Sequence, residues 1–194
     1  TGKSSLAEAI AKETNSDFYY LNAGSLITSY QGSGSESINA VFNHTENSSK
    51  NSVIFIDEVD AITNNDINDK NGESLRATRN LQCNLSQNKS ICILATNYPD
   101  KLPQPLKDRF ITVEIKLPMV ADIVDFLRKG LRVKGYYSST DTLQAIANMF
   151  NDLNYRDLSK ILVNSTSMIK SRSIEDRILT EKDYIVAIYN QRPK

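Results

Sequence analysis

A run of four apolar residues at 53–56 leads directly into two carboxylates, Asp57 and Glu58. A short continuous apolar run of this kind is typical of a parallel strand that is buried on both faces. A second such run, at 91–95, is followed one residue later by Asn97. Because open α/β sheets bind ligands at the carboxyl ends of their strands, we expect these polar side chains to form part of a site there.

Helical patterns alternate with these apolar runs, which predicts a parallel α/β sheet sandwiched by helices. Apolar residues recur at helical spacing in three segments, and two more segments have strand character. The expected helices lie at 5–12, 35–42 and 73–87, and the further strands at 17–22 and 113–115. The side chains expected to face inward from the longest helix are Leu75, Leu81 and Leu85.

The pattern changes after Leu117 and Pro118, where only helical stretches follow. They are expected at 120–131, 142–150, 156–172 and 181–189. Thr180 and Asp183 resemble a capping arrangement for the last of them. The sequence therefore predicts an α/β domain at residues 1–117 and a small all-α domain at 118–194.

The chain begins with Thr1, Gly2, Lys3 and Ser4, the tail of the phosphate-binding pattern G-x-x-x-x-G-K-[ST]. A helix that starts here directs its amide groups and its positive dipole end at a phosphate. Lys3 is expected to neutralise the β- and γ-phosphates and Ser4 to ligate Mg²⁺, with Ser5 completing the nucleotide-binding segment. The leading half of the loop and one central strand are then expected upstream of residue 1; the alternative is a frayed terminus with an accidental lysine.

The two strand ends supply the remaining chemistry for nucleotide hydrolysis. Asp57 is expected to hold Mg²⁺ through water next to Ser4, and Glu58 to polarise the attacking water. Asn97 would orient that water or bind the γ-phosphate. The alternatives are a solvated acidic turn at residues 57–58 and an ordinary turn residue at Asn97.

Read in order, GKS, VIFIDEVDAI and ILATNYPDKL resemble the AAA+ ATPases over almost the whole chain. The resemblance is closest to the AAA module of the membrane-anchored AAA metalloproteases and related protein unfoldases. It implies a P-loop NTPase core with a helical lid and ATP and Mg²⁺ as cofactors. It also implies a homo-oligomeric ring, expected to be a hexamer, that hydrolyses ATP and remodels or unfolds protein. No protease site is expected in this chain, because His44 is its single histidine.

The resemblance also assigns a substrate contact. Residues 30–34 line up with the family's aromatic–x–G–x–G pore loop, so Tyr30, Gln31 and Gly32 are expected to grip a threaded polypeptide. An exposed aromatic ring beside glycine can pack between side chains without sequence preference. Gln31 stands where the family usually has an aliphatic residue. The alternative for Tyr30 is a core tyrosine.

Two arginines receive roles from the same resemblance. Arg109, preceded by Asp108 as in the Lon-type variant, is expected to reach the γ-phosphate of a neighbouring subunit's ATP. Its alternative is a pair with an acidic neighbour in the same chain. Arg156 is expected to touch ATP from the lid; its alternative is a surface arginine that pairs with Asp152 or Asp157.

Two other functions stay open. One is a nucleotide-dependent scaffold or switch with weak hydrolysis. Gln31, and Arg109 as the single arginine expected to reach a neighbour's ATP (the arginine finger), are compatible with this function. Glu58 and Asn97 argue against it. The other is a clamp-loader or initiator-like ATPase that acts on DNA. Against it, 23 Lys and Arg balance 23 Asp and Glu, so a partner bound through bulk charge, such as nucleic acid, is not expected.

The remaining composition bears on location. No apolar run approaches the roughly 18 residues of a membrane span, so no membrane segment is expected within the chain. Cys83 and Cys92 form no C-x-x-C pair and are expected to be ordinary buried thiols of a reducing, intracellular compartment. The cytoplasm is the compartment that this favours.

Overall fold

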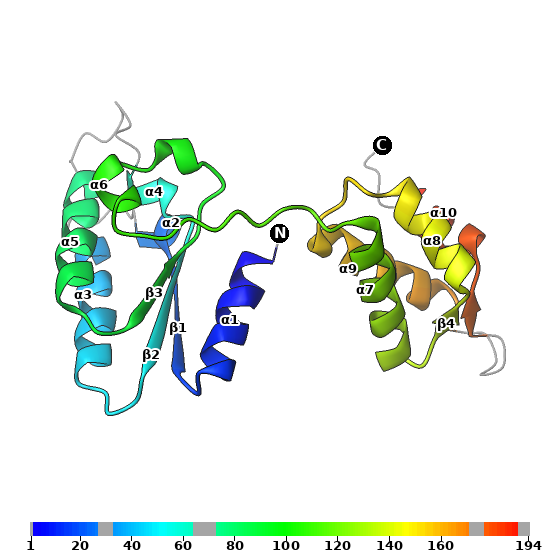
Figure 1. The fold of residues 1–194 in the computed structure, drawn as a ribbon, viewed down its shortest axis with the longest axis horizontal. Coiled ribbons are helices and arrows are strands. Elements are labelled where there is room, and N and C mark those ends of the chain that lie inside the picture. Colours follow the sequence, from blue (N-terminus) through cyan, green and yellow to red (C-terminus); the bar gives the residue numbers. More distant parts are fainter. Residues whose placement is uncertain (1, 27–32, 64–72, 171–176, 190–194) are drawn as a thin grey trace. The chain divides into compact units, whose positions relative to one another are not determined.

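A computed structural model describes residues 2–26, 33–63, 73–170 and 177–189 (Figure 1). They form two compact units. One spans Lys3–Val113 and the other consists mainly of Glu114–Lys194.

The first unit contains a parallel sheet in the order β1-β2-β3, built from β1 (Asp17–Asn22), β2 (Ser52–Asp57) and β3 (Ile91–Leu94). The register pairs Asn22 with Asp57 and Ile56 with Leu94. The three strands therefore end together at one edge of the sheet, as parallel strands do when they are in step.

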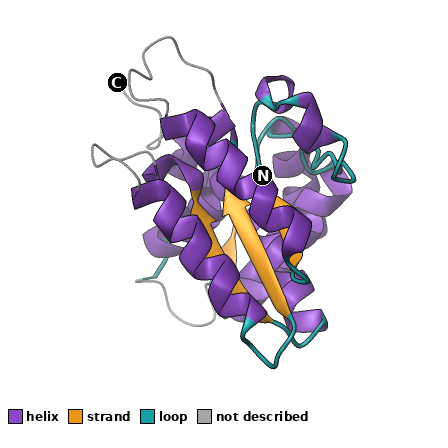
Figure 2. Cartoon of the chain, turned by 90° about the vertical axis from the view of Figure 1, so that its left-hand side faces the viewer, coloured by secondary structure: helices purple, strands orange, loops and turns teal. Residues whose placement is uncertain are grey.

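The central strand β2 is the most deeply buried element of this unit. Its residues Val53, Ile54, Phe55 and Ile56 are all fully buried. Helix α1 (Lys3–Glu13) covers one face, where Ala7 packs with Phe55. Helices α3 (Ser33–Glu46) and α5 (Glu73–Gln87) cover the other face (Figures 1 and 2). Burial on both faces explains why β2 is apolar without alternation.

Four short elements complete the unit at the ends of the strands. They are α2 (Ala23–Leu26), α4 (Asp60–Thr63), the 3₁₀ turn η1 (Pro99–Lys101) and α6 (Gln104–Lys107). Two of them follow strand ends directly: α2 follows β1, and α4 begins three residues after β2. They therefore frame the edge where the polar strand ends meet.

Asparagine side chains bridge α3 and α5. Asn84 Nδ2 donates to Asn39 Oδ1 at 2.9 Å. One turn later, Asn88 Nδ2 donates to Phe42 O and to Thr45 Oγ1, both at 3.1 Å. We call Asn39, Asn84 and Asn88 the asparagine bridge. Because these partly buried amides are satisfied across the interface, they fix how the two helices sit against each other.

The second unit is a helical cluster of α7 (Val120–Val133), α8 (Thr140–Met149), α9 (Tyr155–Met168) and α10 (Glu181–Tyr189). Their apolar faces share one core, in which Ile123, Leu127 and Tyr184 are fully buried. The expected cap of the last helix is confirmed, because Thr180 N and Oγ1 donate to Asp183 Oδ2 at 2.9 and 2.8 Å.

The fold class expected from the sequence is confirmed, and the strand at 17–22 and the helix at 73–87 have the expected bounds. The all-α expectation for the second unit missed a two-residue parallel pair, β4 (Tyr137–Ser138) with β5 (Ile178–Leu179). Strands this short carry no periodicity that a sequence could reveal. The domain boundary between residues 117 and 118 stays a prediction.

Three expectations for the predicted α/β domain were wrong. No strand forms at 113–115, residues that the structure describes, where Val113 is 71% exposed. A strand needs a neighbour to satisfy its backbone groups, and within the described chain β2 alone pairs with β3. Leu75 does not face inward and is 44% exposed, whereas Leu81 of the same helix is fully buried. Cys83, expected to be buried, is exposed, because it lies two positions after Leu81 and so on the opposite face of α5.

This contrast gives a stability prediction. Replacing Leu81 with Ala removes a buried side chain between α5 and the sheet and should cost about 2–5 kcal/mol of unfolding free energy. Replacing Leu75 with Ala in the same helix should cost less than about 1 kcal/mol, because the residue is largely in solvent. Urea unfolding of both variants measures the difference. Equal losses would contradict the assigned orientation of α5.

Candidate functional site

Backbone hydrogen bonds continue beyond the ends of β2 and β3. Ala95 N donates to Ile56 O at 2.8 Å, and Val59 N donates back to Ala95 O at 3.0 Å. The segment with Asp57 and Glu58 and the segment with Asn97 are therefore hydrogen-bonded to each other where they leave the sheet. Their polar side chains lie close together at the carboxyl edge of the sheet.

Lys3, the first residue of α1, also lies at this edge of the sheet, although it is distant in sequence. Its ammonium donates to Thr96 O at 3.2 Å and to the side-chain oxygen of Asn97. The structure thus brings together a lysine and an amide that lie 94 positions apart. Both acceptors are neutral oxygens, so they leave the positive charge of Lys3 uncompensated.

The start of α1 presents further groups that suit an anion. Gly2 has φ +94°, a left-handed conformation that favours glycine. Ser4, partly buried, and Ser5 follow in the first turn, which contains no acidic residue. The amide groups and positive dipole of this 11-residue helix are therefore not neutralised by a carboxylate of its own first turn. Thr1 lies outside the described residues.

Glu58 stands at a sharp turn of the chain. Its φ is +55°, which is uncommon for a residue with a side chain. Its amide donates to Asp57 Oδ1 at 3.0 Å, and its Oε2 accepts from Asn22 Nδ2 at 3.4 Å. Gly24 lies so close that an added Cβ would be 3.2 Å from Glu58 Oε2. A strained backbone at an exposed carboxylate, held by a neighbour, is the kind of geometry that functional sites retain.

Asn22 and Asp60 were not singled out from the sequence. Asn22 ends β1 opposite Asp57, and its polar character at the end of an apolar strand is the signal that could have revealed it. Asp60 opens α4 and accepts from Thr96 Oγ1 at 2.6 Å, while Thr96 Oγ1 accepts from Tyr98 N at 2.9 Å. These bonds fix the turn that carries Asn97.

The other expected site residues lie elsewhere. Tyr30, Gln31 and Gly32 are outside the described residues. Arg156 is exposed in the first turn of α9, in the second unit. In the part of the chain that the structure describes, no ion pair joins it to an aspartate, and Asp157 pairs with Lys160 at 3.2 Å instead. The alternative that pairs Arg156 with Asp157 is therefore not seen.

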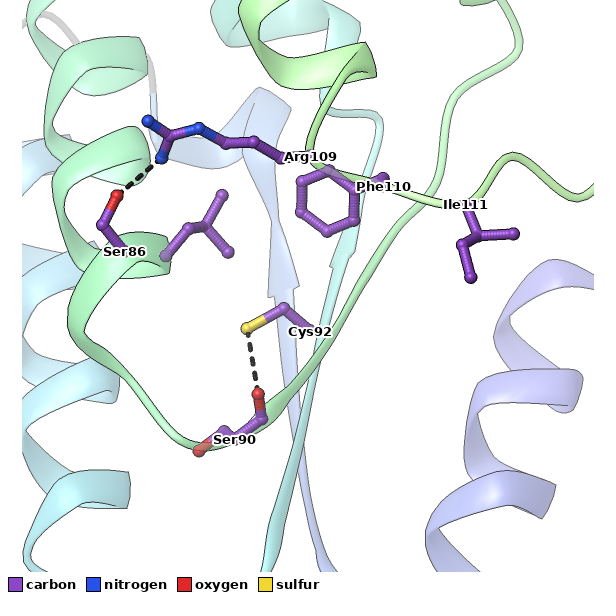
Figure 3. A pocket seen from close by; sticks show the side chains of 7 residues that line it. Ser86, Ser90, Cys92, Arg109, Phe110 and Ile111 are labelled. Carbon is purple, nitrogen blue, oxygen red and sulfur yellow. Dashed lines mark hydrogen bonds between the residues drawn. The ribbon is translucent and has the colours of Figure 1, made fainter.

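Arg109 follows α6 and lies against α5. Its Nη1 donates to Gln82 O at 3.0 Å and to Ser86 Oγ at 2.6 Å, so its partners are neutral, not the acidic neighbour considered above. It lines a pocket of about 590 Å³ with Ser90 and Cys92 among the other lining residues (Figure 3). Burial raises the pKa of the Cys92 thiol to about 11.

Comparison with known proteins identifies the family. Residues 1–118 match the model of the ATPase family associated with various cellular activities (AAA). The chain belongs to the AAA family of ATPases. Its N-terminal Gly-Lys-Ser, its paired carboxylates after β2 and its Asn97 lie within the matched region.

Two named relatives have similar sequences. Spastin from Ixodes scapularis is 30% identical over 171 residues, covering 82% of this chain and 26% of that protein. The ATP-dependent zinc metalloprotease FtsH from Lachnoclostridium phytofermentans is 35% identical over 113 residues, covering 55% of this chain and 19% of that protein. The chain thus spans about a quarter or less of these relatives.

A solved structure supports the fold independently. The FIGL-1 AAA domain, determined in complex with ADP, superposes with a TM-score of 0.78 over all of this chain and 69% of that one, at 21% identity. Within the described residues, no helix has both the length and the apolar composition to span a membrane.

The residues at the strand ends suit a magnesium nucleotide. Mg²⁺ takes oxygen ligands, keeps several waters and needs only one or two protein groups. Ser4 and Asp57 can each supply an oxygen ligand. The helix α1, which carries Ser4, packs on β2, which carries Asp57. The described residues contain no cluster of three or more His, Cys, Asp or Glu side chains, so no all-protein metal cage is present among them.

The bond between Thr96 and Asp60 gives a second prediction. Thr96→Val keeps the side-chain shape but leaves the Asp60 carboxylate without this donor, and should cost up to about 3 kcal/mol of unfolding free energy. Asp60→Asn retains an acceptor oxygen and should cost less than half as much. Thr14→Val, at an exposed hydroxyl that bonds Ile10 O at 2.8 Å, serves as control. Equal urea midpoints for Thr96→Val and the parent would contradict this role.

Proposed function

We propose that this chain is an ATP-hydrolysing AAA motor module that assembles into a homo-oligomeric ring, a hexamer, and remodels or unfolds protein substrates. The observation that carries the proposal is the contact of the Lys3 ammonium with Asn97 beside the paired carboxylates Asp57 and Glu58. Family membership supports nucleotide hydrolysis, and the site supplies a group for each part of that reaction.

Lys3 and the start of α1 bind the phosphates. A phosphate oxygen is a stronger partner for an ammonium than a neutral carbonyl or amide oxygen, so Lys3 turns from Thr96 O and Asn97 toward the nucleotide. The amide groups at the start of α1 add donors that need no rearrangement. Ser4 and Asp57 hold Mg²⁺, which when bound neutralises charge on the β- and γ-phosphates.

Glu58 acts on the attacking water. Its exposed carboxylate is the hydrogen-bond acceptor that orients the water and accepts its proton. Asn22 holds the other side of this carboxylate at 3.4 Å, and Gly24 leaves the space that the contact requires. Asn97, once Lys3 has turned away, is available to the γ-phosphate or the same water.

Further groups complete the site on assembly. Arg109 is proposed to stabilise the γ-phosphate of ATP held by a neighbouring copy, and its exposure supports this role. Arg156 is proposed to touch ATP from the helical lid in cis, which its exposed place at the start of α9 supports. Tyr30, with Gln31 and Gly32, is proposed to contact the translocating polypeptide. A reducing, cytoplasmic compartment stays a prediction.

A mixing experiment tests the shared site. In the full-length protein, Glu58→Gln should keep ATP binding but lower turnover by orders of magnitude, because Gln cannot accept the proton. Arg109→Ala should also be inactive. Mixed rings should recover part of the activity, since a Glu58→Gln copy supplies Arg109 to a neighbour whose Glu58 is intact. If mixed assembly is shown by native mass spectrometry and no activity returns, Arg109 does not act in trans.

Tyr30 separates a motor from a nucleotide-dependent scaffold or switch. As a pore residue it takes no part in nucleotide chemistry, so Tyr30→Ala should leave basal ATP hydrolysis near the parent value and abolish stimulation by an unfolded protein substrate. Tyr30→Phe should behave as the parent, because ring area provides the grip. A Tyr30→Ala protein that loses about 3 kcal/mol or more of stability, with both activities falling together, would identify a core tyrosine and contradict threading.

A further inference from the structure

The side chain of Arg109 is held by a single turn of α5. Its Nη1 donates to Gln82 O at 3.0 Å and to Ser86 Oγ at 2.6 Å. Ser86 Oγ in turn donates to Gln82 O at 2.9 Å, which uses its only proton and leaves its lone pairs for the arginine. These three groups form a closed triangle, part of which is visible in Figure 3.

Electrostatics favour a cation at this place. Gln82 and Ser86 lie in the last two turns of α5, where the helix dipole is negative. The last turn of α5 contains no basic residue of its own. Arg109 supplies that charge from another segment, so both hydrogen bonds are charge-assisted.

The anchoring elements are themselves fixed. The asparagine bridge ties α5 to α3, and Leu81 of α5 is fully buried between them and the sheet. At the other end of the arginine, Arg109 N donates to Leu106 O at 3.1 Å, and Leu106 is buried. The arginine is therefore held at its backbone and at its tip by two elements of the same unit.

The triangle occupies only one of the two terminal amino groups. A guanidinium has five N–H donors in a planar fork. Among the described residues, the hydrogen bonds of the Arg109 side chain all leave from Nη1. The Nη2 and Nε donors remain for an incoming phosphate, and the plane in which they lie is set by Ser86 and Gln82.

We propose that Ser86 is a positioning residue that orients Arg109 on α5, so that the free edge of the guanidinium is presented to the γ-phosphate of ATP bound by a neighbouring copy. This inference rests on the proposed trans role of Arg109. A finger held in place before the reaction loses less rotational freedom in the transition state than a mobile one. Ser86 touches no reacting atom, and its effect passes through Arg109 alone.

ATPase kinetics of the assembled full-length protein test this role. Ser86→Ala should lower kcat about 3- to 10-fold, the effect of one hydrogen bond, with little change in KM for ATP. Ser86→Thr restores the hydroxyl and should recover at least half of the lost rate. Ser90→Ala, on the same pocket but outside the triangle, should behave as the parent. Sedimentation and thermal unfolding confirm that each variant is folded and assembled. A kcat for Ser86→Ala equal to or above that of the parent would overturn the proposal.

A double variant distinguishes positioning from a general structural role. Single-turnover conditions measure the slow residual hydrolysis that remains in Arg109→Ala. Ser86→Ala combined with Arg109→Ala should hydrolyse ATP at this same residual rate, because the serine has nothing left to orient. A further loss in the double variant would overturn the positioning role.

The same measurements separate this inference from the proposed function. If Arg109→Ala alone turns over normally, the proposed trans role of the arginine fails. If Arg109→Ala is inactive while Ser86→Ala matches the parent, the finger stands and only the positioning role of Ser86 is overturned.

Discussion

The pairing of β2 with a parallel strand on each side is the constraint on which the site depends. It sets the register in which Asn22 lies opposite Asp57, and it continues beyond the strands through the bond from Ala95 N to Ile56 O. Because β2 is buried on both faces, a one-residue slip would exchange its two packed faces and is strongly disfavoured. The carboxylates at its end are thus placed by the core, although they themselves face solvent or are only partly buried.

Two cations proposed to meet phosphates share a physical property. Lys3 bonds to a carbonyl and an amide oxygen, and Arg109 bonds to a carbonyl and a hydroxyl oxygen. In the described parts of the chain, the ion pairs with carboxylates involve other lysines, namely Lys50, Lys129 and Lys160. Neutral acceptors hold a cation in place without cancelling its charge, so each side chain is ordered and still attractive to an anion.

The sequence was most informative where the apolar residues of an element follow a regular pattern. The apolar run of β2 and the helical period of α5 fixed their positions, and the motifs at residues 2–4, 57–58 and 97 pointed to one sheet edge. It was least informative where a role depends on contacts distant in sequence. Asn22 and Asp60 look like ordinary polar residues until register and turns place them beside Glu58 and Thr96. The expected strand at 113–115 shows the converse: local apolar character does not make a strand without a paired neighbour.

The two cysteines differ in burial, so that Cys83 on α5 can be labelled selectively. Cys92 is held as a neutral thiol by burial, with its pKa near 11, whereas Cys83 is exposed on α5 immediately after Gln82. Alkylating reagents attack the thiolate, so at neutral pH a maleimide dye should attach to Cys83 and spare Cys92. Cys83 therefore offers an attachment position for a fluorescent reporter one residue from the carbonyl that holds Arg109, without the need to introduce a cysteine.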